Sequence, residues 1–437
     1  LWRACMIQLL IVADDFTGAL DTGVQLAKQG CRTSVTTRYP PDFSQIPEHT
    51  QVLVADTQSR HLPPEEAYIR TYRWFEAAKG LGRVLLYKKT DSTMRGNIGA
   101  ELQAAISGSG REKLLFVPAL PQLGRTTRQG VVYIDGIPLE QTPFASDPFT
   151  PVCSSSLREI ILHTAPELRV AVTKPALLLE DYHSAEEKSV LAVDAADITQ
   201  LQEIALTSYA FREQVVFAGC AGFAQMLPCM LRHAAPAPRR APRPNSCLIV
   251  CGSVNQIAVE QIQYAERLGI SSILLQPYQY LDEAYWQSAE GQLFLSQLVE
   301  RQKHEKCLIL KTVGSEADIL CARRYAVDRQ PSGKQLHLQI ADNLGNLTAR
   351  VIRAARPELI TVFGGDTLFG ILRNLGVDTI TPERELLPGV VQSVLSSSVD
   401  CVRVVSKAGG FGGPSLVEAI LREYQLLQPE KAKQPIS

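Results

Sequence analysis

Patterns that usually mark a metal centre are missing from this 437-residue sequence. Its ten cysteines form no CxxC pair, and its seven histidines form no HExxH pattern. The cysteines closest in sequence, Cys247 and Cys251, enclose a strand-like apolar run, whereas a metal site needs a turn between its ligands. We therefore expect reduced thiols, a cytosolic protein and no structural zinc.

Long apolar runs and a strong net charge are also missing. No run approaches the roughly 18 apolar residues of a membrane-spanning helix, and no signal-peptide cleavage pattern follows the short apolar stretch near the N-terminus. The formal net charge of −1 provides no basic field for binding a phosphate backbone. We expect neither a membrane nor a nucleic acid as partner. Met6 directly precedes the first predicted strand, so residues 1–5 are interpreted as an upstream extension.

Two nucleotide-binding signatures are absent. The sequence has no GxxxxGK[ST] motif, and no GxGxxG follows the first predicted strand of either half. A P-loop ATPase and a dinucleotide-dependent dehydrogenase are therefore disfavoured.

The length and one proline-rich segment indicate two domains. A chain of 437 residues exceeds what one hydrophobic core usually serves. Residues 234–246 contain several prolines, which lack an amide donor and therefore disfavour both helix and central strand. We predict a first domain at residues 1–233, a linker at 234–246 and a second domain at 247–437.

Strand-like and helix-like segments alternate in both halves. In the first half, strands are predicted at residues 9–13, 32–37, 51–55, 84–88 and 114–117, with helices at 18–29 and from Pro64 onward. In the second half, strands are predicted at residues 247–251, 307–311, 359–363 and 401–405. Such alternation favours parallel sheets covered by helices. The predicted fold is α/β, with two domains, each a largely parallel sheet flanked by helices, and an interdomain cleft.

Aspartates follow the predicted strands of the first half. Asp14 and Asp15 follow the first strand, Asp56 follows the strand at 51–55, and Asp91 comes shortly after the strand at 84–88. Because open α/β sheets bind ligands at the carboxyl ends of their strands, we interpret these acids as lining one cleft, with chance alternation as the alternative. Phosphoryl transfer to a hydroxyl needs a carboxylate that orients or deprotonates the nucleophile. Asp14 and Asp15 are the candidates for this catalytic role.

Cations, a carboxylate and hydroxyl groups are concentrated between residues 88 and 97. The polar residues there include Lys88, Lys89, Asp91, Ser92, Arg95 and Asn97. Such a loop fits a small polyhydroxy acid, because cations bind its carboxylate and Asp binds its hydroxyls; a surface loop of salt bridges is the alternative. Arg60 could form a bidentate clamp on the same carboxylate. The polar segment 118–130 is interpreted as a lid or an Ω-loop, with a structural role slightly favoured.

Glycine-bearing loops follow the predicted strands of the second half, at residues 252–253, 314–315, 364–367 and 407–413. Glycine lets backbone amides approach phosphate oxygens, and a following helix adds its positive N-terminus, so the pattern indicates a nucleotide site. Lys407 could reach the terminal phosphates or be a solvated lysine at the loop mouth. Asp366 could hold a magnesium-bound water or cap the helix that follows.

Four motifs occur in order along the chain: IVADDFTG at residues 11–18, KKTDSTMRGN at 88–97, GGDT at 364–367 and KAGGFG at 407–412. Together they resemble the four-carbon acid sugar kinase family. The resemblance covers nearly the whole chain, and the proline-rich break lies between the second and third motifs. The version here is most similar to the D-threonate kinase branch.

The resemblance implies an activity and two sets of binding residues. Members of the family use ATP to phosphorylate threonate, erythronate or 3-oxo-tetronate, so ATP and Mg²⁺ are the expected cofactors. The family's N-terminal domain binds the acid, which together with the polar loop gives the substrate-side residues Asp14, Arg60, Lys89, Thr90, Asp91, Ser92, Arg95 and Asn97. Its C-terminal domain binds ATP, which together with Lys407 of the glycine loop gives the nucleotide-side residues Ser253, Gly364, Gly365, Asp366, Thr367, Lys407, Gly409 and Gly410.

Two alternatives to a D-threonate kinase are open at this point. The chain could act on D-erythronate or 3-oxo-tetronate, or it could be a non-catalytic sensor that binds a sugar acid or a nucleotide. The intact carboxylates and glycine loops argue against the sensor. A homodimer is common for enzymes of this size, but no residue pattern requires one.

Overall fold

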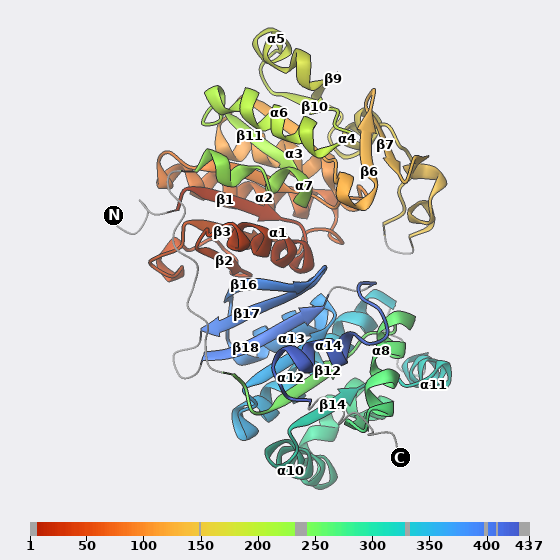
Figure 1. Cartoon of the computed structure of the whole chain (residues 1–437). Helices are drawn as coiled ribbons and strands as arrows, with labels where there is room; N and C mark the ends of the chain where they lie inside the picture. The colour runs from red at the N-terminus through yellow and green to blue at the C-terminus, as the bar shows by residue number, and fades with distance from the viewer. Residues whose placement is uncertain are drawn as a thin grey trace, which may run out of the picture. The chain divides into compact units, whose positions relative to one another are not determined.

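The structure is a computed structural model that describes residues 7–147, 150–231, 243–327, 333–396, 401–407 and 410–427. The predicted upstream extension, residues 234–242 of the predicted linker and Gly409 lie outside the described residues. The chain divides into two compact units, Leu1–Ala237 and Pro238–Ser437, which we describe one at a time (Figure 1). None of the described helices is long and apolar enough to cross a membrane.

The first unit contains a sheet of eight parallel strands in the order β2-β3-β1-β4-β11-β5-β10-β9. The strands are β1 (Leu9–Ala13), β2 (Thr33–Thr36), β3 (Val52–Asp56), β4 (Leu85–Lys89), β5 (Lys113–Val117), β9 (Arg169–Thr173), β10 (Ser189–Val193) and β11 (Val215–Gly219). The helices are α1 (Phe16–Lys28), α2 (Pro64–Ala78), α3 (Ile98–Ser109), α4 (Leu157–Thr164), α5 (Leu178–Ser184), α6 (Ile198–Ser208) and α7 (Ala221–Ala224).

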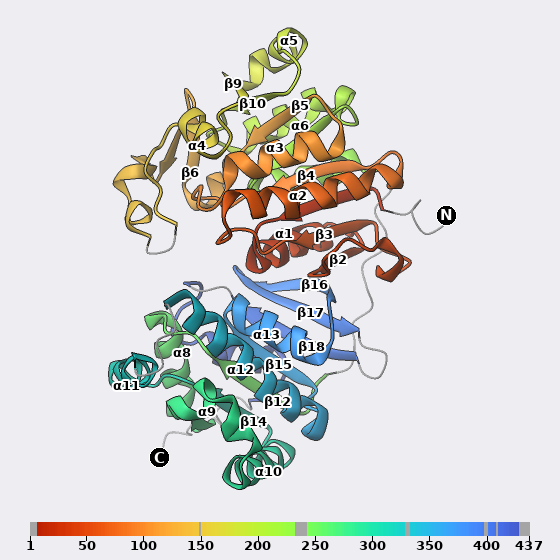
Figure 2. The same ribbon diagram turned by 180° about the vertical axis from the view of Figure 1, so that it is seen from behind.

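Helices cover both faces of this sheet because its central strands are apolar on both sides. Every residue of β1 is buried. Leu10 and Val12 face a core that also contains Trp74 of α2 and Leu102 of α3. The helices α2 and α3 lie side by side on this face (Figure 2), and α1, α6 and α7 cover the other face (Figure 1).

A small antiparallel sheet replaces the loop predicted at residues 118–130. It contains β6 (Arg125–Arg128), β7 (Val131–Ile134) and β8 (Ile137–Pro138). The prediction of a loop was wrong for residues 125–128, which pair with the following strand through a turn at Gln129 and Gly130, both with positive φ; residues 118–124 lie outside the sheet. Alternation along so short and polar a strand gives little sequence signal.

The second unit contains a sheet in the order β13-β14-β12-β15-β18-β17-β16. Its strands are β12 (Cys247–Cys251), β13 (Ser271–Leu274), β14 (Cys307–Lys311), β15 (Leu359–Phe363), β16 (Thr379–Leu387), β17 (Val390–Ser396) and β18 (Cys401–Lys407). The first five strands of this order are parallel, and β17 pairs antiparallel with both β18 and β16. The helices are α8 (Gln256–Arg267), α9 (Pro277–Leu281), α10 (Ala289–His304), α11 (Glu316–Val327), α12 (Gly333–Ala355), α13 (Gly365–Leu375) and α14 (Leu416–Glu423).

Two separate hydrophobic cores cover the two faces of the second sheet. Ile249 of β12 packs in a core with side chains of α8 and α14. Figure 1 shows these two helices on one face of the sheet. Leu248 and Val250, on either side of Ile249, face the opposite core with α10 and α12 (Figure 2), as the period of two along a strand requires. The prediction of a largely parallel sheet flanked by helices is confirmed for each unit.

The two sheets share a strand order at their centres. In the first unit, β3 lies on one side of β1 and β4 on the other; in the second, β14 and β15 flank β12 in the same way. The direction of the chain across the sheet therefore reverses beside β1 and beside β12. In open α/β sheets, ligands bind at the carboxyl ends of the strands at this reversal point.

Candidate active site

The predicted acid-binding residues meet at the carboxyl edge of the first sheet. Ala13, the last residue of β1, is in register with Asp56 of β3 and with Lys89 of β4. Asp14 and Thr90, which follow these strands, therefore lie at one edge, at the reversal point between β1 and β4. The first unit places its polar residues where its topology predicts a ligand.

Arg60 joins three carboxylates at this edge. Its Nε donates to Asp14 Oδ2 at 2.6 Å, its Nη2 donates to Asp15 Oδ1 at 2.6 Å, and Nη2 lies 3.6 Å from Asp91 Oδ1. The side chain of Arg60 is only 10% exposed. Burial alone would lower the pKa of Arg60, but the three carboxylates outweigh it and raise that pKa well above its usual range.

Asp91 is held by a second guanidinium. Arg95 donates from Nε to Asp91 Oδ2 at 2.9 Å and from Nη2 to Asp91 Oδ1 at 3.1 Å, and Thr93 Oγ1 also donates to Oδ2, at 2.5 Å. Burial acts to raise the pKa of Asp91, yet the charges of Arg60 and Arg95 hold it well below its usual range. The loop does contain salt bridges, as the alternative interpretation expected, but Asp91 and Arg60 are buried, so these ion pairs do not lie on the surface.

Asp14 and Asp15 differ in exposure and in charge. The Asp14 side chain is 1% exposed and that of Asp15 is 24% exposed. Burial acts to raise the pKa of Asp14, but Arg60, Lys88 and Lys89 outweigh it and lower that pKa. For Asp15 burial is again the largest influence, Arg60 does not fully offset it, and the pKa is raised. Of the two, Asp15 is the carboxylate that a ligand can reach.

Asp15 also begins helix α1. It is the N-cap residue, and its Oδ1 accepts a hydrogen bond from the Gly18 amide at 3.1 Å. A Cβ atom on Gly18 would lie 2.5 Å from Asp15 Oδ1 and 2.9 Å from Lys89 Nζ, so glycine is needed for the approach of these two groups. Lys89 donates to the Thr90 carbonyl at 2.7 Å and forms no ion pair with the residues that the structure describes.

The other predicted substrate-side residues have different surroundings. Thr90 is buried, and its Oγ1 has no hydrogen-bond partner among the residues that the structure describes. Ser92 accepts a hydrogen bond from Arg125 of β6. The Asn97 amide donates to the carbonyls of Ser59 at 3.0 Å and Leu62 at 2.9 Å, so it fixes the segment after β3.

Two more polar side chains lie beneath this edge: Glu101, which sequence reasoning missed, and Asp56, which was predicted to line the cleft. Glu101 of α3 is buried against Lys88, whereas a Glu in the first turn of a helix is normally solvated. Asp56 is buried and accepts one hydrogen bond from the Gln58 amide at 3.0 Å, and its Oδ2 finds no partner in the described part of the chain. Burial raises the pKa of Asp56 well above its usual range, and the charges of Asp15 and Asp14 add to this rise.

The glycine loops of the second unit meet at the carboxyl edge of its sheet. Cys251 of β12 is in register with Phe363 of β15, and Phe363 with Lys407 of β18. A Cβ atom on Gly252 would lie 2.7 Å from Thr367 Oγ1, so glycine permits the close approach of β12 to the start of α13. These loops surround the reversal point between β12 and β15, next to the N-terminus of an 11-residue helix.

The start of α13 differs from the predicted one. The helix begins at Gly365, and Gly364, with φ of 105°, takes the N-cap position without a side-chain cap. Asp366 is therefore an exposed residue of the first turn and not the N-cap, so the prediction that it caps this helix was wrong. An acidic first turn does not exclude phosphate binding, since the first amides of a helix remain available to an anion.

Lys407 and the remaining nucleotide-side residues lie around this edge. Lys407 is 2% exposed, and burial lowers its pKa, so the alternative of a solvated lysine is wrong. Ser253 is half-buried and its Oγ accepts from the Asn255 amide at 3.2 Å; Gly410 is exposed. Gln261 of α8, which was also missed, donates to the carbonyls of Phe411, Gly412 and Gly413 at 2.9–3.1 Å and so holds the glycine loop.

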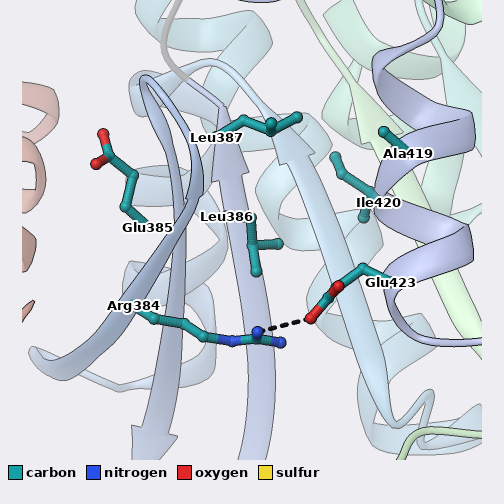
Figure 3. Close-up of a pocket in the computed structure, with 7 residues that line it drawn as sticks. All are labelled: Arg384, Glu385, Leu386, Leu387, Ala419, Ile420 and Glu423. Carbon is teal, nitrogen blue, oxygen red and sulfur yellow. Dashed lines mark hydrogen bonds and ion pairs between the residues drawn. The ribbon is translucent and has the colours of Figure 1, made fainter.

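A pocket elsewhere in the second unit is not part of this edge (Figure 3). Its volume is about 230 Å³, and an ion pair between Arg384 and Glu423 crosses it at 2.7 Å. Its lining residues are Arg384, Glu385, Leu386, Leu387, Ala419, Ile420 and Glu423. None of them is a predicted site residue. Among the described residues, no group of three or more His, Cys, Asp or Glu side chains is arranged to hold a metal ion.

The two units match two different family models. A family model described as a sugar-binding N-terminal domain matches residues 9–227, and one described as a nucleotide-binding C-terminal domain matches residues 248–417. Solved structures from Salmonella typhimurium LT2 (TM-score 0.78) and Haemophilus influenzae (TM-score 0.73) are each 20% identical and share the fold. They cover 96% and 95% of this chain, and 100% of their own.

Curated relatives extend over nearly the whole chain. A D-threonate kinase of Salmonella typhimurium is 32% identical over 94% of this chain and 96% of its own length. A D-erythronate kinase of Heliobacterium modesticaldum is 27% identical over 96% of this chain and 98% of its own length. A 3-oxo-tetronate kinase of Methylobacterium radiotolerans is also 27% identical, over 92% of this chain and 96% of its own length. With matching models for both units and a 32% identical relative along almost its full length, the chain belongs to the four-carbon acid sugar kinase family.

Proposed function

We propose that the protein transfers the γ-phosphoryl group of ATP to the terminal hydroxyl of a four-carbon sugar acid. Our preferred substrate is D-threonate, with 4-phospho-D-threonate as product. The observation that carries the proposal is Arg60, held by Asp14, Asp15 and Asp91 at the reversal point of the unit that matches the sugar-binding model. Glycine loops occupy the equivalent edge of the unit that matches the nucleotide-binding model.

The charges at the first edge suit a small hydroxy acid. Lys89 has no carboxylate partner among the described residues, so its ammonium group is available to the carboxylate of the acid. Asp91 and Asp15 supply acceptor oxygens for the hydroxyl groups. The approach of Lys89 and Asp15 at Gly18 brings a cation and an acceptor to the same point, as a hydroxy acid requires.

Asp15 is our candidate for the general base. It is the more exposed of the two neighbouring carboxylates, and its raised pKa makes it a better proton acceptor than Asp14. Asp14 is almost fully buried and bonded to Arg60 Nε, so it holds the guanidinium in place. Arg60 in turn orients Asp15 through Nη2.

The second edge suits the phosphates of ATP. The amides at the start of α13 and the close approach at Gly252 form a concave backbone surface, and Lys407 adds a cation at the end of β18. Mg²⁺ would neutralise charge on the phosphates during transfer, and it commonly binds phosphate oxygens with only one or two carboxylates. Asp366, exposed beside Gly365, is the residue that would hold its water.

The choice among four-carbon acids rests on the relatives. The D-threonate kinase of Salmonella typhimurium is 32% identical, whereas the D-erythronate and 3-oxo-tetronate kinases named above are each 27% identical. The three acids differ at one stereocentre or one carbonyl. A site that hydrogen-bonds a hydroxyl can reject an analogue lacking it strongly, so measured specificity constants decide the substrate.

The test is a coupled ADP-release assay with Mg²⁺-ATP against D-threonate, L-threonate, D-erythronate and 3-oxo-tetronate. We expect acid-dependent ADP release, highest kcat/KM for D-threonate, and a loss of about 10²–10⁴-fold in Asp15→Asn. Asp197→Asn is the matched control, because Asp197 is likewise an N-cap, of α6, and accepts the Gln200 amide at 2.8 Å. Asn can cap a helix, so neither variant loses its cap.

Two results would change the proposal. Binding of an acid without any ADP release would favour a non-catalytic sensor. Full turnover in Asp15→Asn, with loss in Asp14→Asn, would transfer the role of base to Asp14.

A further inference from the structure

A buried ion pair lies directly beneath the acid-binding edge. Lys88 Nζ of β4 is 3.0 Å from Glu101 Oε2 of α3, and the two side chains are 0% and 1% exposed. Neither group can reach solvent. The match to the sugar-binding family model gives no role to this pair.

The pair is connected to all three strand ends that form the edge. Ser59, beyond β3, donates to Glu101 Oε1. Ser59 Oγ lies 2.6 Å from Thr57 Oγ1, and Thr57 Oγ1 donates to the carbonyl of Ala13, at the end of β1, at 2.8 Å. Lys88 donates to the carbonyl of Lys89, at the end of β4, at 2.7 Å.

These connections lead to the two residues that organise the site. The Ser59 and Arg60 amides donate to the Asp14 carbonyl at 2.9 and 3.2 Å, so the segment held by Glu101 also fixes the backbone of Asp14. Lys88 acts on the side chain as well, because its charge is one of those that lower the pKa of Asp14.

Stability alone does not account for such a pair. Removing two charges from water costs several kcal/mol for each ion, and replacing a buried pair by apolar residues of similar volume is often neutral or stabilising. This buried pair joins the three segments that follow β1, β3 and β4. It therefore also fixes the positions of these segments relative to one another.

We propose that the Lys88–Glu101 pair, acting through Ser59, is a positioning device that sets Asp14 and Arg60 in the geometry that the sugar acid requires. This inference rests on the proposed function. The pair touches no substrate, and its effect reaches the acid through the backbone of residues 57–60 and the charge behind Asp14.

The test compares single and double replacements. Glu101→Leu and Lys88→Met each leave one buried charge without its partner, so both are expected to lower the unfolding temperature. The double variant Lys88→Met/Glu101→Leu removes both charges, and we expect its unfolding temperature to return close to that of the wild type. We expect its KM for D-threonate to stay raised by about 10- to 100-fold, while its KM for ATP changes by less than about twofold.

The double variant separates a positioning role from a structural one. A purely structural pair would give a stable double variant with wild-type KM and kcat, and that result overturns the proposal. A rise in the KM for ATP equal to the rise for the acid would also overturn it, because the disturbance would then not be specific to the acid-binding edge.

Ser59→Ala provides an independent test without any change of charge. Ser59→Ala removes the donor to Glu101, and we expect a rise of about 10-fold in the KM for D-threonate. Ser208→Ala is the matched control, because Ser208 is also buried and donates only within α6, to the carbonyls of Ile204 and Ala205. Equal kinetics in Ser59→Ala and Ser208→Ala would contradict the proposal.

Failure of the proposed function can be distinguished from failure of this inference. If the wild type releases no ADP with any acid, the kinase proposal fails, and the positioning role is then measured by calorimetric titration with D-threonate. A Kd raised in the double variant would still support positioning. An unchanged Kd, or no binding by the wild type, would overturn it.

Discussion

Arg60 is the cation that balances the carboxylates at the carboxyl edge of the first sheet. It uses Nε for Asp14 and Nη2 for Asp15, so the same cation holds a carboxylate that is almost fully buried and one that a ligand can reach. Lysine could not replace it, because an ammonium group lacks two donors in a fixed plane. Asp56, at the same edge, has no such cation among the described residues.

Asp56 gives a prediction about stability and pH. Its pKa is raised well above 3.8 by burial, so the folded state retains a proton that the unfolded state loses. This stabilisation is complete below the unfolded pKa and is lost as pH rises toward the folded pKa. Asp56→Asn keeps a neutral group of the same shape, so we expect it to exceed the wild type in free energy of unfolding at pH 8, and the difference should grow as the pH rises above 3.8.

Urea unfolding at several pH values checks this prediction. At pH 3.5 the two proteins are expected to have nearly equal stability, because Asp56 is then mostly protonated in both states of the wild type. The carboxylates with lowered pKa, Asp14 and Asp91, affect both proteins alike and cancel in the difference. A variant less stable than the wild type at pH 8 would show that Asp56 is charged in the folded protein.

Sequence reasoning reached some site residues and missed others for a physical reason. Asp14, Arg60 and Asp91 follow strands, and the carboxyl ends of parallel strands converge, so their meeting could be predicted. Glu101 lies inside a helix, and only the packing of α3 against the sheet turns it toward Lys88. That orientation depends on tertiary structure, which no local pattern records.

At the scale of secondary-structure elements, strands end and helices begin at the carboxyl edge of each of the two sheets. The predicted strand at 84–88 is β4 at Leu85–Lys89, and the predicted helix at 18–29 is α1 at Phe16–Lys28. The strands β12, β14 and β15 have the predicted bounds, because each is a mostly apolar segment of five residues bordered by polar or glycine residues. The antiparallel strands β16 and β17 were not predicted, since the charged residues of β16 obscure its alternation.

Gly18 gives a prediction at this scale. In a helix, alanine is more favourable than glycine by up to about 1 kcal/mol. This gain offsets part of the cost of moving the Asp15 and Lys89 side chains aside, so we expect Gly18→Ala to change the unfolding temperature little. Its Cβ would push against Asp15 Oδ1 and Lys89 Nζ, which should lower kcat/KM for the acid by about 10-fold or more.

Kinetic and thermal measurements on two alanine variants check this expectation. Gly80→Ala is the control, because a Cβ at Gly80 would meet nothing within 4 Å. Equal kcat/KM in Gly18→Ala and the wild type would indicate that the approach of Lys89 to α1 has no role in turnover.

On the scale of the whole molecule, each unit has hydrophobic cores of its own. The core around Leu10 and Val12 contains residues of the first unit alone, and those around Ile249 and Leu248 contain residues of the second alone. The presence of parallel sheets in both halves could be predicted from the alternation of elements. The common strand order could not, because local sequence patterns do not determine which strands are neighbours.

Separate cores give a prediction for thermal unfolding. In scanning calorimetry, D-threonate at 100 times its Kd should stabilise the first unit by about 2.7 kcal/mol, and Mg²⁺-ATP should do the same for the second. Each ligand is therefore expected to raise the midpoint temperature of a different unfolding transition. A single unfolding transition whose midpoint temperature rises equally with either ligand would show that the two units unfold together.

The common strand order has a consequence for how substrate preference changes during evolution. In both units the strands supply the fold, while the residues just after them supply the polar groups. If the acid binds at the first edge as proposed, mutations in the segments after β1, β3 and β4 would alter acid recognition without rebuilding a core. Relatives named for three different acids align with this chain over 92–96% of its length, as such a separation of fold from recognition predicts.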